Sequence, residues 1–255
     1  MDELARTWSF ECAMQDRCAR MRREFAHGTA LYNDQLRRVY DTNFVRFERG
    51  FDELTGDLVE AAADELQASL RHRKVLIPDE QAGARVADEL RERGWRHYTL
   101  VTMAYRGPRD RTAVSGEQPR PAEQVDPRAV RGAREQAHDA GRRDAEAHRQ
   151  IIAFTELMAT VVPSRMYAAF TEGEVGSYCA LFQEHGIGQI DEVTTVPRFQ
   201  RRGLGTAAVE AALRASLADG DDLTFLVADQ ADWPHEWYAR LGFEPIGRRY
   251  ELLRV

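Results

Sequence analysis

The segment from Val193 to Thr206, with the sequence VTTVPRFQRRGLGT, restricts the possible fold more than any other part of the chain. It predicts a strand, a turn of the pattern Gln-x-x-Gly-x-Gly, and a helix that begins directly after the turn. Gly203 and Gly205 let the backbone approach a ligand, and the free amides of a helix N-terminus attract negative charge. We therefore expect an anion-binding loop that holds a diphosphate, with added charge from Arg201 and Arg202. The alternative is a glycine-rich helix start whose arginines only face solvent.

The sequence around this segment alternates between helical and extended patterns. Residues 127–161 have a helical composition, and three segments of alternating hydrophobicity follow them, separated by short turns that contain glycine. The expected elements are strands at Tyr167–Phe170, Gly176–Phe182 and Gln189–Val196, a helix at Gly203–Ala218, a strand at Leu223–Val227, a helix near Trp237–Leu241 and an extended stretch to Val255. This order predicts an α/β fold built on a mixed sheet.

The amino-terminal half has its own alternation of strands and helices. The expected elements are strands at Thr29–Asn33, Asn43–Phe47 and Lys74–Ile77, helices at Phe51–Arg71 and Gln81–Arg93, and an extended segment at Arg96–Tyr105. Residues 106–128 hold four prolines and almost no apolar side chains, which is typical of a linker or a long surface loop. The predicted division is therefore a smaller domain at 1–107, a linker at 108–127 and a second domain at 128–255.

Composition excludes several classes of protein. The 255 residues are 43% hydrophobic and 30% charged, which is enough to bury a core. The net charge of −7, without a long basic block, argues against nucleic acid or an anionic membrane as partner. The sequence has no signal peptide and no long apolar run, so a cytoplasmic protein is expected. Three cysteines without pairing or metal-ligand spacing predict reduced thiols and no metal site.

Two motifs resemble those of the GCN5-related N-acetyltransferases (GNATs). The first is Gln200-Arg-Arg-Gly-Leu-Gly205, which is similar to the acetyl-CoA loop of that family, between a strand and a helix. The second is Phe225-Leu-Val-Ala-Asp229 followed by Trp237-Tyr-Ala-Arg-Leu-Gly-Phe243, similar to the family's strand, Asn or Asp, and Tyr shortly before Gly-Phe. The resemblance covers about residues 128–255 and implies the acyl-CoA N-acyltransferase fold.

The resemblance also implies acetyl-CoA as co-substrate and the residues that hold it. In this family two neighbouring strands splay apart around the pantetheine, and main-chain amides of the loop bind the diphosphate. The matching positions are Thr194, Thr195 and Val196 for the pantetheine, Gln200, Arg201, Arg202, Gly203, Leu204, Gly205 and Thr206 for the diphosphate, and Asp229 at the family's Asn or Asp position near the mouth of the slot. No metal is implied.

Transfer of an acetyl group from a thioester to an amine needs a base and an acid. An amine with a pKa near 10.4 is almost wholly protonated at pH 7, so a base or a water chain that ends at one must take its proton. The candidates are Asp191 and Glu192, which would point to opposite faces of a regular strand, and the sequence does not choose between them. Tyr238 is at the family's tyrosine position and is expected to protonate the leaving thiolate. The alternative roles are a solvated carboxylate and a packing aromatic.

A weak internal repeat suggests that the amino-terminal half is a degenerate copy of the same fold. Val75-Leu76-Ile77, Asp79 and Gly94-Trp95 parallel Phe225-Leu226-Val227, Asp229 and Gly242-Phe243, which could also arise by chance. This half has no Gln-x-x-Gly-x-Gly turn, so we expect one active site, with the first half as a wall or scaffold.

The sequence therefore predicts an N-acetyltransferase that acts on a small-molecule amine by direct attack, as a monomer or a homodimer. Direct attack is preferred because Cys12, Cys18 and Cys179 lie outside both motifs. The alternatives are a non-catalytic acyl-CoA sensor or assembly subunit and, more weakly, a protein acetyltransferase. The acceptor is not identified, because in this family loops of unknown shape select it.

Overall fold

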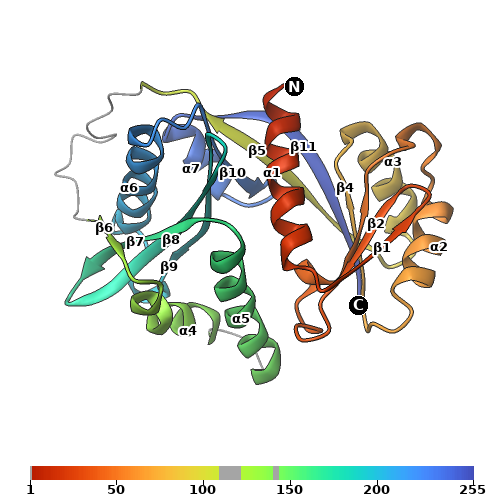
Figure 1. The fold of residues 1–255 in the computed structure, drawn as a ribbon, viewed down its shortest axis with the longest axis horizontal. Helices are drawn as coiled ribbons and strands as arrows, with labels where there is room; N and C mark the ends of the chain where they lie inside the picture. Colours follow the sequence, from red (N-terminus) through yellow and green to blue (C-terminus); the bar gives the residue numbers. More distant parts are fainter. Residues whose placement is uncertain (1, 109–121, 140–143) are drawn as a thin grey trace. The chain divides into compact units, whose positions relative to one another are not determined.

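A computed structural model describes residues 2–108, 122–139 and 144–255 (Figure 1). The chain divides into two compact units, and the division does not follow the order of the sequence. Unit 1 consists of Met1–Met103, Val227–Glu236 and Pro245–Val255, and unit 2 consists of Ala104–Leu226 and Trp237–Glu244. None of the helices within the described ranges is long and apolar enough to cross a membrane.

Unit 1 is built on strands ordered β1-β2-β3-β4-β11, in which β3 runs parallel to β4 and β11 antiparallel to it. Its helices are α1 (Glu3–Cys18), α2 (Gly56–Leu66) and α3 (Glu80–Arg91), and its strands are β1 (Met21–Phe25), β2 (Gly28–Tyr32), β3 (Phe44–Phe47), β4 (Arg73–Ile77), most of β5 (Arg96–Tyr105) and most of β11 (Phe243–Arg254). Short 3-10 turns occupy Tyr40–Thr42 and Phe51–Glu53.

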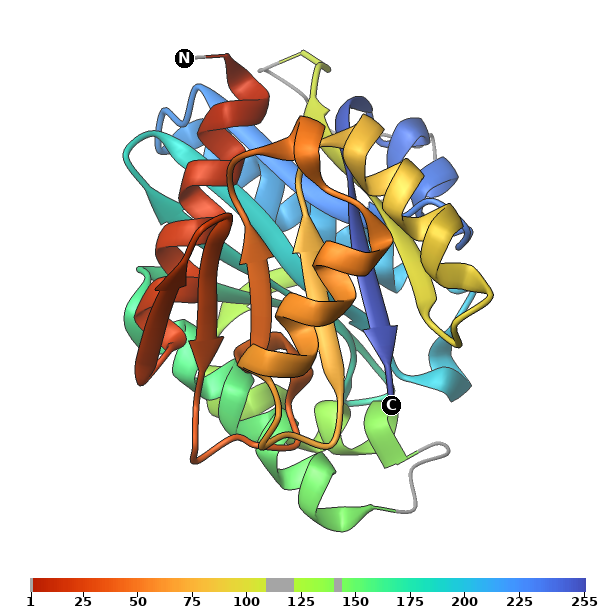
Figure 2. The same ribbon diagram turned by 90° about the vertical axis from the view of Figure 1, so that its right-hand side faces the viewer.

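Helices cover both faces of the unit 1 sheet (Figures 1 and 2). Alternate residues of each strand point to opposite faces, so each face can bury its own apolar set. The main core joins Val45, Val75 and Ile77 of the strands to the apolar sides of α2 and α3. On the other face, Leu31, Phe44 and Leu76 pack against Trp8 of α1.

Unit 2 is built on strands ordered β10-β9-β8-β7-β6, of which β10 and β9 are parallel. Its strands are β6 (Ala122–Val125), β7 (Ser164–Thr171), β8 (Glu174–Glu184), β9 (Ile187–Thr195) and the first part of β10 (Leu223–Asp229), and its helices are α4 (Arg131–Asp139), α5 (Ala145–Val161), α6 (Leu204–Ala218) and the end of α7 (Pro234–Arg240), with 3-10 turns at Pro127–Val130 and Pro197–Phe199. The α6 helix contacts β6 to β9, and α4 contacts β8 and β9.

Two tight turns form the predicted three-stranded meander. Glu172 and Gly173 have φ of 57° and 80°, and His185 and Gly186 have φ of 55° and 76°. Each pair is the whole connection between two antiparallel strands. Two successive left-handed residues give the turn that matches the twist of neighbouring strands. The meander β7-β8-β9 therefore holds β9, which carries the candidate site, in a fixed register.

The structure corrects several sequence-based expectations. The α2 helix is shorter than the predicted Phe51–Arg71, because Thr55 caps its N-terminus. Strand β6 lies inside the predicted linker, most of which falls outside the described residues. Helix α1 and strand β1 were not predicted. The end of the chain also differs, since residues 245–255 belong to unit 1 and not to the predicted second domain.

Candidate active site

The N-terminus of α6 differs from those of α1, α2, α3 and α5 in how its first-turn amides are bonded. Side chains of Asp2, Thr55, Asp79 and Asp144 accept hydrogen bonds from first-turn amides of α1, α2, α3 and α5. Among the described residues no side chain caps α6, whose N-cap residue is Gly203. The first amides of a helix have no partner inside the helix. Those of α6 are therefore available to an external acceptor at the positive end of the helix dipole.

The loop before α6 is shaped for a close backbone approach. Arg201 and Gly203 have φ of 58° and 76°, in the left-handed region that curls the chain. A Cβ on Gly205 would lie 3.2 Å from Oγ1 of Thr195 and 3.4 Å from the ring of Trp237. The indole Nε1 of Trp237 donates to Oγ1 of Thr206 at 3.2 Å. Strand end, loop and helix start thus meet at one point.

The two predicted arginines have different surroundings. Arg202 pairs with Glu172 at 2.6 Å and lies over the ring of Phe199. Arg201 is exposed, and the described part of the chain gives it no ion-pair partner. Arg201 is therefore the cation best placed to meet an anion at the loop.

Strand β9 leaves its parallel partner part-way along its length. Pairing between β9 and β10 runs from Ile187↔Leu223 to Gln189↔Phe225, whereas β9 continues to Thr195. On its other edge β9 stays bound to β8, where Oγ of Ser177 donates to the Thr194 carbonyl at 2.8 Å. The next residue, Val196, donates its N–H to the carbonyl of Gly176 at 2.9 Å. Over the described residues, the edge of β9 beyond Gln189 is thus not paired with β10 and can bond an extended ligand.

A bulge in β9 overturns the expectation that Asp191 and Glu192 must point to opposite faces. Glu192 has φ of 52°, and the register with β8 shifts between Tyr178 and Ala180. Strict alternation holds only for a regular strand, and a bulge re-aims the side chains around it. The positions of the two carboxylates are therefore given by their contacts.

Glu192 is bound to α4. Its carboxylate pairs with NH2 of Arg134 at 2.7 Å, and both side chains are almost fully buried. The Arg134 guanidinium also lies over the ring of Tyr178, 5.6 Å from its centroid. Burial raises the pKa of Glu192, while the charge and hydrogen bond of Arg134 oppose this shift. The pair fixes α4 against the bulge.

Asp191 has different contacts from those of Glu192, and its charge acts on Tyr238. Its Oδ1 accepts from the backbone N–H of Glu192 at 2.7 Å, and its Oδ2 accepts from Nε2 of Gln189 at 3.3 Å. Burial raises the pKa of Tyr238, and the negative charge of Asp191 raises it further. The charge of Asp191 therefore favours the protonated form of Tyr238.

Tyr238 is held by aromatic packing. Its ring lies 4.7 Å from that of Trp237 and 6.2 Å from that of Phe243, both measured between centroids. Only 6% of the residue is exposed. None of the described residues forms a hydrogen bond with its hydroxyl, which leaves the proton free for a ligand.

Asp229, the remaining predicted residue, belongs to unit 1. Its Oδ1 accepts from the N–H of Ala231 at 2.9 Å, which stabilises the turn after β10. Sequence reasoning missed Arg134 and Ser177, since neither lies in a motif. Among the described residues there is no group of three or more His, Cys, Asp or Glu that could hold a metal ion.

Comparison with known proteins assigns this site to a family. The model of the acetyltransferase (GNAT) family matches residues 131–243, which include α4, the meander, the α6 loop and Tyr238. This matched segment, residues 131–243, is called the GNAT domain. The predicted mixed α/β fold with GNAT-like architecture is confirmed, and family membership supports acyl transfer as the general chemistry.

Solved structures extend the likeness over nearly the whole chain. A GCN5-related N-acetyltransferase from Kribbella flavida is 21% identical, with a TM-score of 0.63, and the match covers 99% of this chain and 95% of that one. A functionally unknown conserved protein from Staphylococcus epidermidis is 15% identical, with a TM-score of 0.66, covering 91% and 92%. A tandem GNAT protein from the clavulanic acid biosynthesis pathway is 15% identical, with a TM-score of 0.53, covering 78% and 67%. These identities show the fold alone, and no curated protein matches.

GNAT proteins normally use acetyl-CoA as co-substrate, and the residues of this domain fit it. No side chain in the described ranges caps the α6 amides, as a diphosphate requires. The edge of β9 that is not paired with β10 in the described part of the chain can offer backbone groups to the amides of pantetheine.

Proposed function

We propose that the protein is an acetyl-CoA-dependent N-acyltransferase that acetylates a small-molecule amine by direct attack. The observation that carries the proposal is the start of α6, where no described side chain caps the first-turn amides, while side chains cap those of α1, α2, α3 and α5. Such a helix start favours a dianionic group. The cofactor residues are those of the motif: backbone groups of Thr194–Val196 for the pantetheine and of Gln200–Thr206 for the diphosphate, with Arg201 adding charge.

The proton transfers are assigned to Asp191 and Tyr238. As the amine nitrogen attacks the thioester carbonyl carbon, a C–N bond forms and the C–S bond breaks. Asp191, directly or through one water molecule, accepts the proton that the nitrogen loses, and Tyr238 donates its hydroxyl proton to the departing sulfur. Both residues then exchange protons with solvent, and the products are an amide and free CoA.

Asp191 is a better base candidate than Glu192 because of their partners. The Glu192 carboxylate is bound to the Arg134 guanidinium in a buried pair, so accepting a proton would leave Arg134 without its counter-charge. Asp191 accepts from the backbone N–H of Glu192 and from Nε2 of Gln189, and its charge acts on Tyr238.

Direct attack is preferred to a cysteine-linked route. Cys179 is fully buried, its Sγ donates to the carbonyl of Ala208 at 3.3 Å, and burial raises the pKa of its thiol. A protonated, buried thiol is a poor nucleophile. Mass spectrometry after mixing with acetyl-CoA alone checks this point, and an acetylated cysteine would contradict direct attack.

Release of free thiol from acetyl-CoA tests the activity. The full-length protein is mixed with acetyl-CoA and a panel of primary amines, and CoA binding is measured separately by calorimetry. Amine-dependent thiol release supports the proposal. CoA binding without release for any amine would favour a sensor, and absence of CoA binding would contradict both functions.

A further inference from the structure

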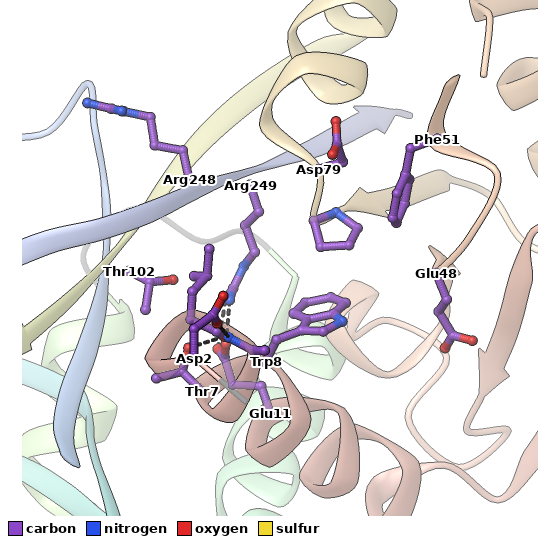
Figure 3. A pocket seen from close by; sticks show the side chains of 13 residues that line it. Asp2, Thr7, Trp8, Glu11, Glu48, Phe51, Asp79, Thr102, Arg248 and Arg249 are labelled. Atoms are coloured by element: carbon purple, nitrogen blue, oxygen red, sulfur yellow. Dashed lines mark hydrogen bonds and ion pairs between the residues drawn. The ribbon is translucent and has the colours of Figure 1, made fainter. Parts of the chain in front are cut away.

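Unit 1 contains a pocket that the GNAT family model does not reach. Its volume is about 290 Å³, near the lower end of the range for small-molecule sites. The lining comes from α1, β5, β11 and the segments that follow β3 and β4, and it includes Trp8, Phe51, Asp79 and Arg249 (Figure 3). The pocket is therefore a candidate ligand site outside the proposed active site.

The pocket lies where ligands commonly bind in α/β sheets. Strands β3 and β4 are parallel, with Val45 opposite Val75 and Arg46 opposite Leu76. Glu48 and Phe51 follow β3, and Asp79 follows β4, so the pocket is at the carboxyl ends of both strands. The crevice outside the carboxyl ends of parallel strands is the usual ligand position in such sheets.

The helix that follows β3 does not offer an anion site. The side chain of Thr55 caps α2 by accepting from the N–H of Leu58, and Oε2 of Glu89 accepts from the N–H of Gly56 at 2.5 Å. The protein's own oxygens thus occupy first-turn amides of α2. The equivalent amides of α6 have no such partner among the described residues. This start of α2 would repel a diphosphate.

The charges around the pocket favour a positive ligand. Both lining arginines are already paired: Arg249 forms two hydrogen bonds with Glu11, and Arg248 pairs with Glu80 at 3.2 Å. Figure 3 shows the Arg248 side chain extending away from the other labelled residues. Asp79 and Asp2 also line the pocket, and neither has an ion-pair partner among the described residues. These two carboxylates have no counter-ion there, and each accepts a first-turn N–H at a helix start, Asp79 from Ala82 and Asp2 from Ala5.

The walls add aromatic surface to these carboxylates. Figure 3 shows the indole of Trp8 below Asp79 in this view and the ring of Phe51 to the right of Asp79. Both residues are partly exposed, so a ligand can reach them, although the Arg249 guanidinium already lies over the Trp8 ring, 5.8 Å from its centroid. An aromatic face attracts a cation, and the gain grows when water is excluded.

We propose that the unit 1 pocket binds a small organic cation, an ammonium group on an apolar body. The ammonium group is placed near the carboxylates of Asp79 and Asp2, and the apolar body lies against Trp8 and Phe51. The proposal does not depend on catalysis in the GNAT domain, since all lining residues belong to unit 1.

Calorimetry on the full-length protein tests the proposal with three probes of similar shape: 2-phenylethylammonium, 2-phenylethanol and 3-phenylpropionate. Asp79→Asn and Asp2→Asn each remove a charge while keeping a side chain that caps a helix. Asp144→Asn makes the same change at the cap of α5 in unit 2, at a residue that does not line the pocket. We expect the ammonium probe to bind at least about tenfold more tightly than the other two. We also expect Asp79→Asn to weaken that binding about tenfold and Asp144→Asn to leave it unchanged.

Three results would overturn the proposal. The first is equal or tighter binding of the carboxylate probe. The second is no saturable binding of the ammonium probe up to about 10 mM. The third is ammonium binding that neither Asp79→Asn nor Asp2→Asn weakens, which would place it elsewhere, including the amine site of the GNAT domain.

Discussion

Tyr238 is buried among aromatic rings, and the negative charge of Asp191 raises its pKa. Removing only its hydroxyl, with Tyr238→Phe, keeps the ring packing against Trp237 and Phe243. We expect kcat to fall about 10²–10⁴-fold, the usual contribution of a general acid, while the Kd for CoA changes little. Steady-state kinetics and calorimetry measure the two quantities.

Tyr167→Phe is the matched control for this substitution. Tyr167 is a buried tyrosine of β7 in the same unit, and burial raises its pKa too. We expect kcat of this variant to stay near that of the wild type. Equal turnover in Tyr238→Phe and the wild type would remove Tyr238 from the mechanism.

The raised pKa of Tyr238 predicts the alkaline side of the pH profile. An ordinary tyrosine has a pKa near 10 and would be half ionised at that pH. Because burial and Asp191 raise the pKa of Tyr238, its proton donor form persists above this point. For an acceptor amine already neutral at pH 8, we expect kcat to stay constant from pH 8 to about 10. If kcat at pH 10 is half of its value at pH 8, Tyr238 titrates as an ordinary tyrosine or is not held in this environment.

At the level of elements, the Arg134–Glu192 pair joins α4 to the bulge of β9. Arg134→Met leaves a buried carboxylate without its cation, which costs about 3–5 kcal/mol of the free energy of unfolding. Adding Glu192→Gln removes the uncompensated charge, so we expect the double variant to recover most of this loss. Urea unfolding of both variants and of Glu192→Gln alone completes the cycle. Additive losses would show that the pair does not couple the two elements.

The sequence predicted elements better than it predicted their irregularities. Alternating apolar residues and the Glu-Gly and His-Gly turns were sufficient for the meander, and Gly203 marked the start of α6. Nothing in the side chain of Glu192 signals a positive φ, because a non-glycine residue adopts it only when its surroundings require it. The choice between Asp191 and Glu192 therefore needed the contacts of the folded chain.

At the level of the whole molecule, the predicted domain at 1–107 lacks a strand of unit 1. In the structure β11 pairs with β4, Lys74 pairs with Glu251 at 2.8 Å, and buried Glu11 binds Arg249. We expect a fragment of residues 1–107 to remain unfolded, since it exposes the edge of β4 and leaves these groups unpaired. Circular dichroism and the chemical-shift dispersion of NMR spectra measure folding. Addition of a peptide of residues 243–255 should restore folding. A well-dispersed spectrum of the fragment alone would contradict this account.

The return of the last strand to unit 1 was beyond sequence reasoning for a physical reason. Hydrophobic periodicity reports which residues face a core, and it does not say which core. The residues from Phe243 to Arg254 show an extended pattern that suits either unit. Only the pairing with β4 and the ion pairs of Glu251 and Arg249 decide the matter.

The central claim is that the backbone amides at the start of α6 bind a diphosphate. Calorimetric titration of CoA into Gly203→Ala tests it, with Gly220→Ala as control. Both glycines have positive φ, 76° for Gly203 and 89° for Gly220, so alanine strains the backbone at both by about 1–2 kcal/mol. Gly220 lies at the other end of α6, where an added Cβ meets nothing within 4 Å. We predict that Gly203→Ala weakens CoA binding about tenfold or more and that Gly220→Ala leaves CoA binding unchanged. Pantetheine, which lacks the diphosphate, should bind both variants with equal affinity. Equal CoA affinity in the two variants would contradict the account.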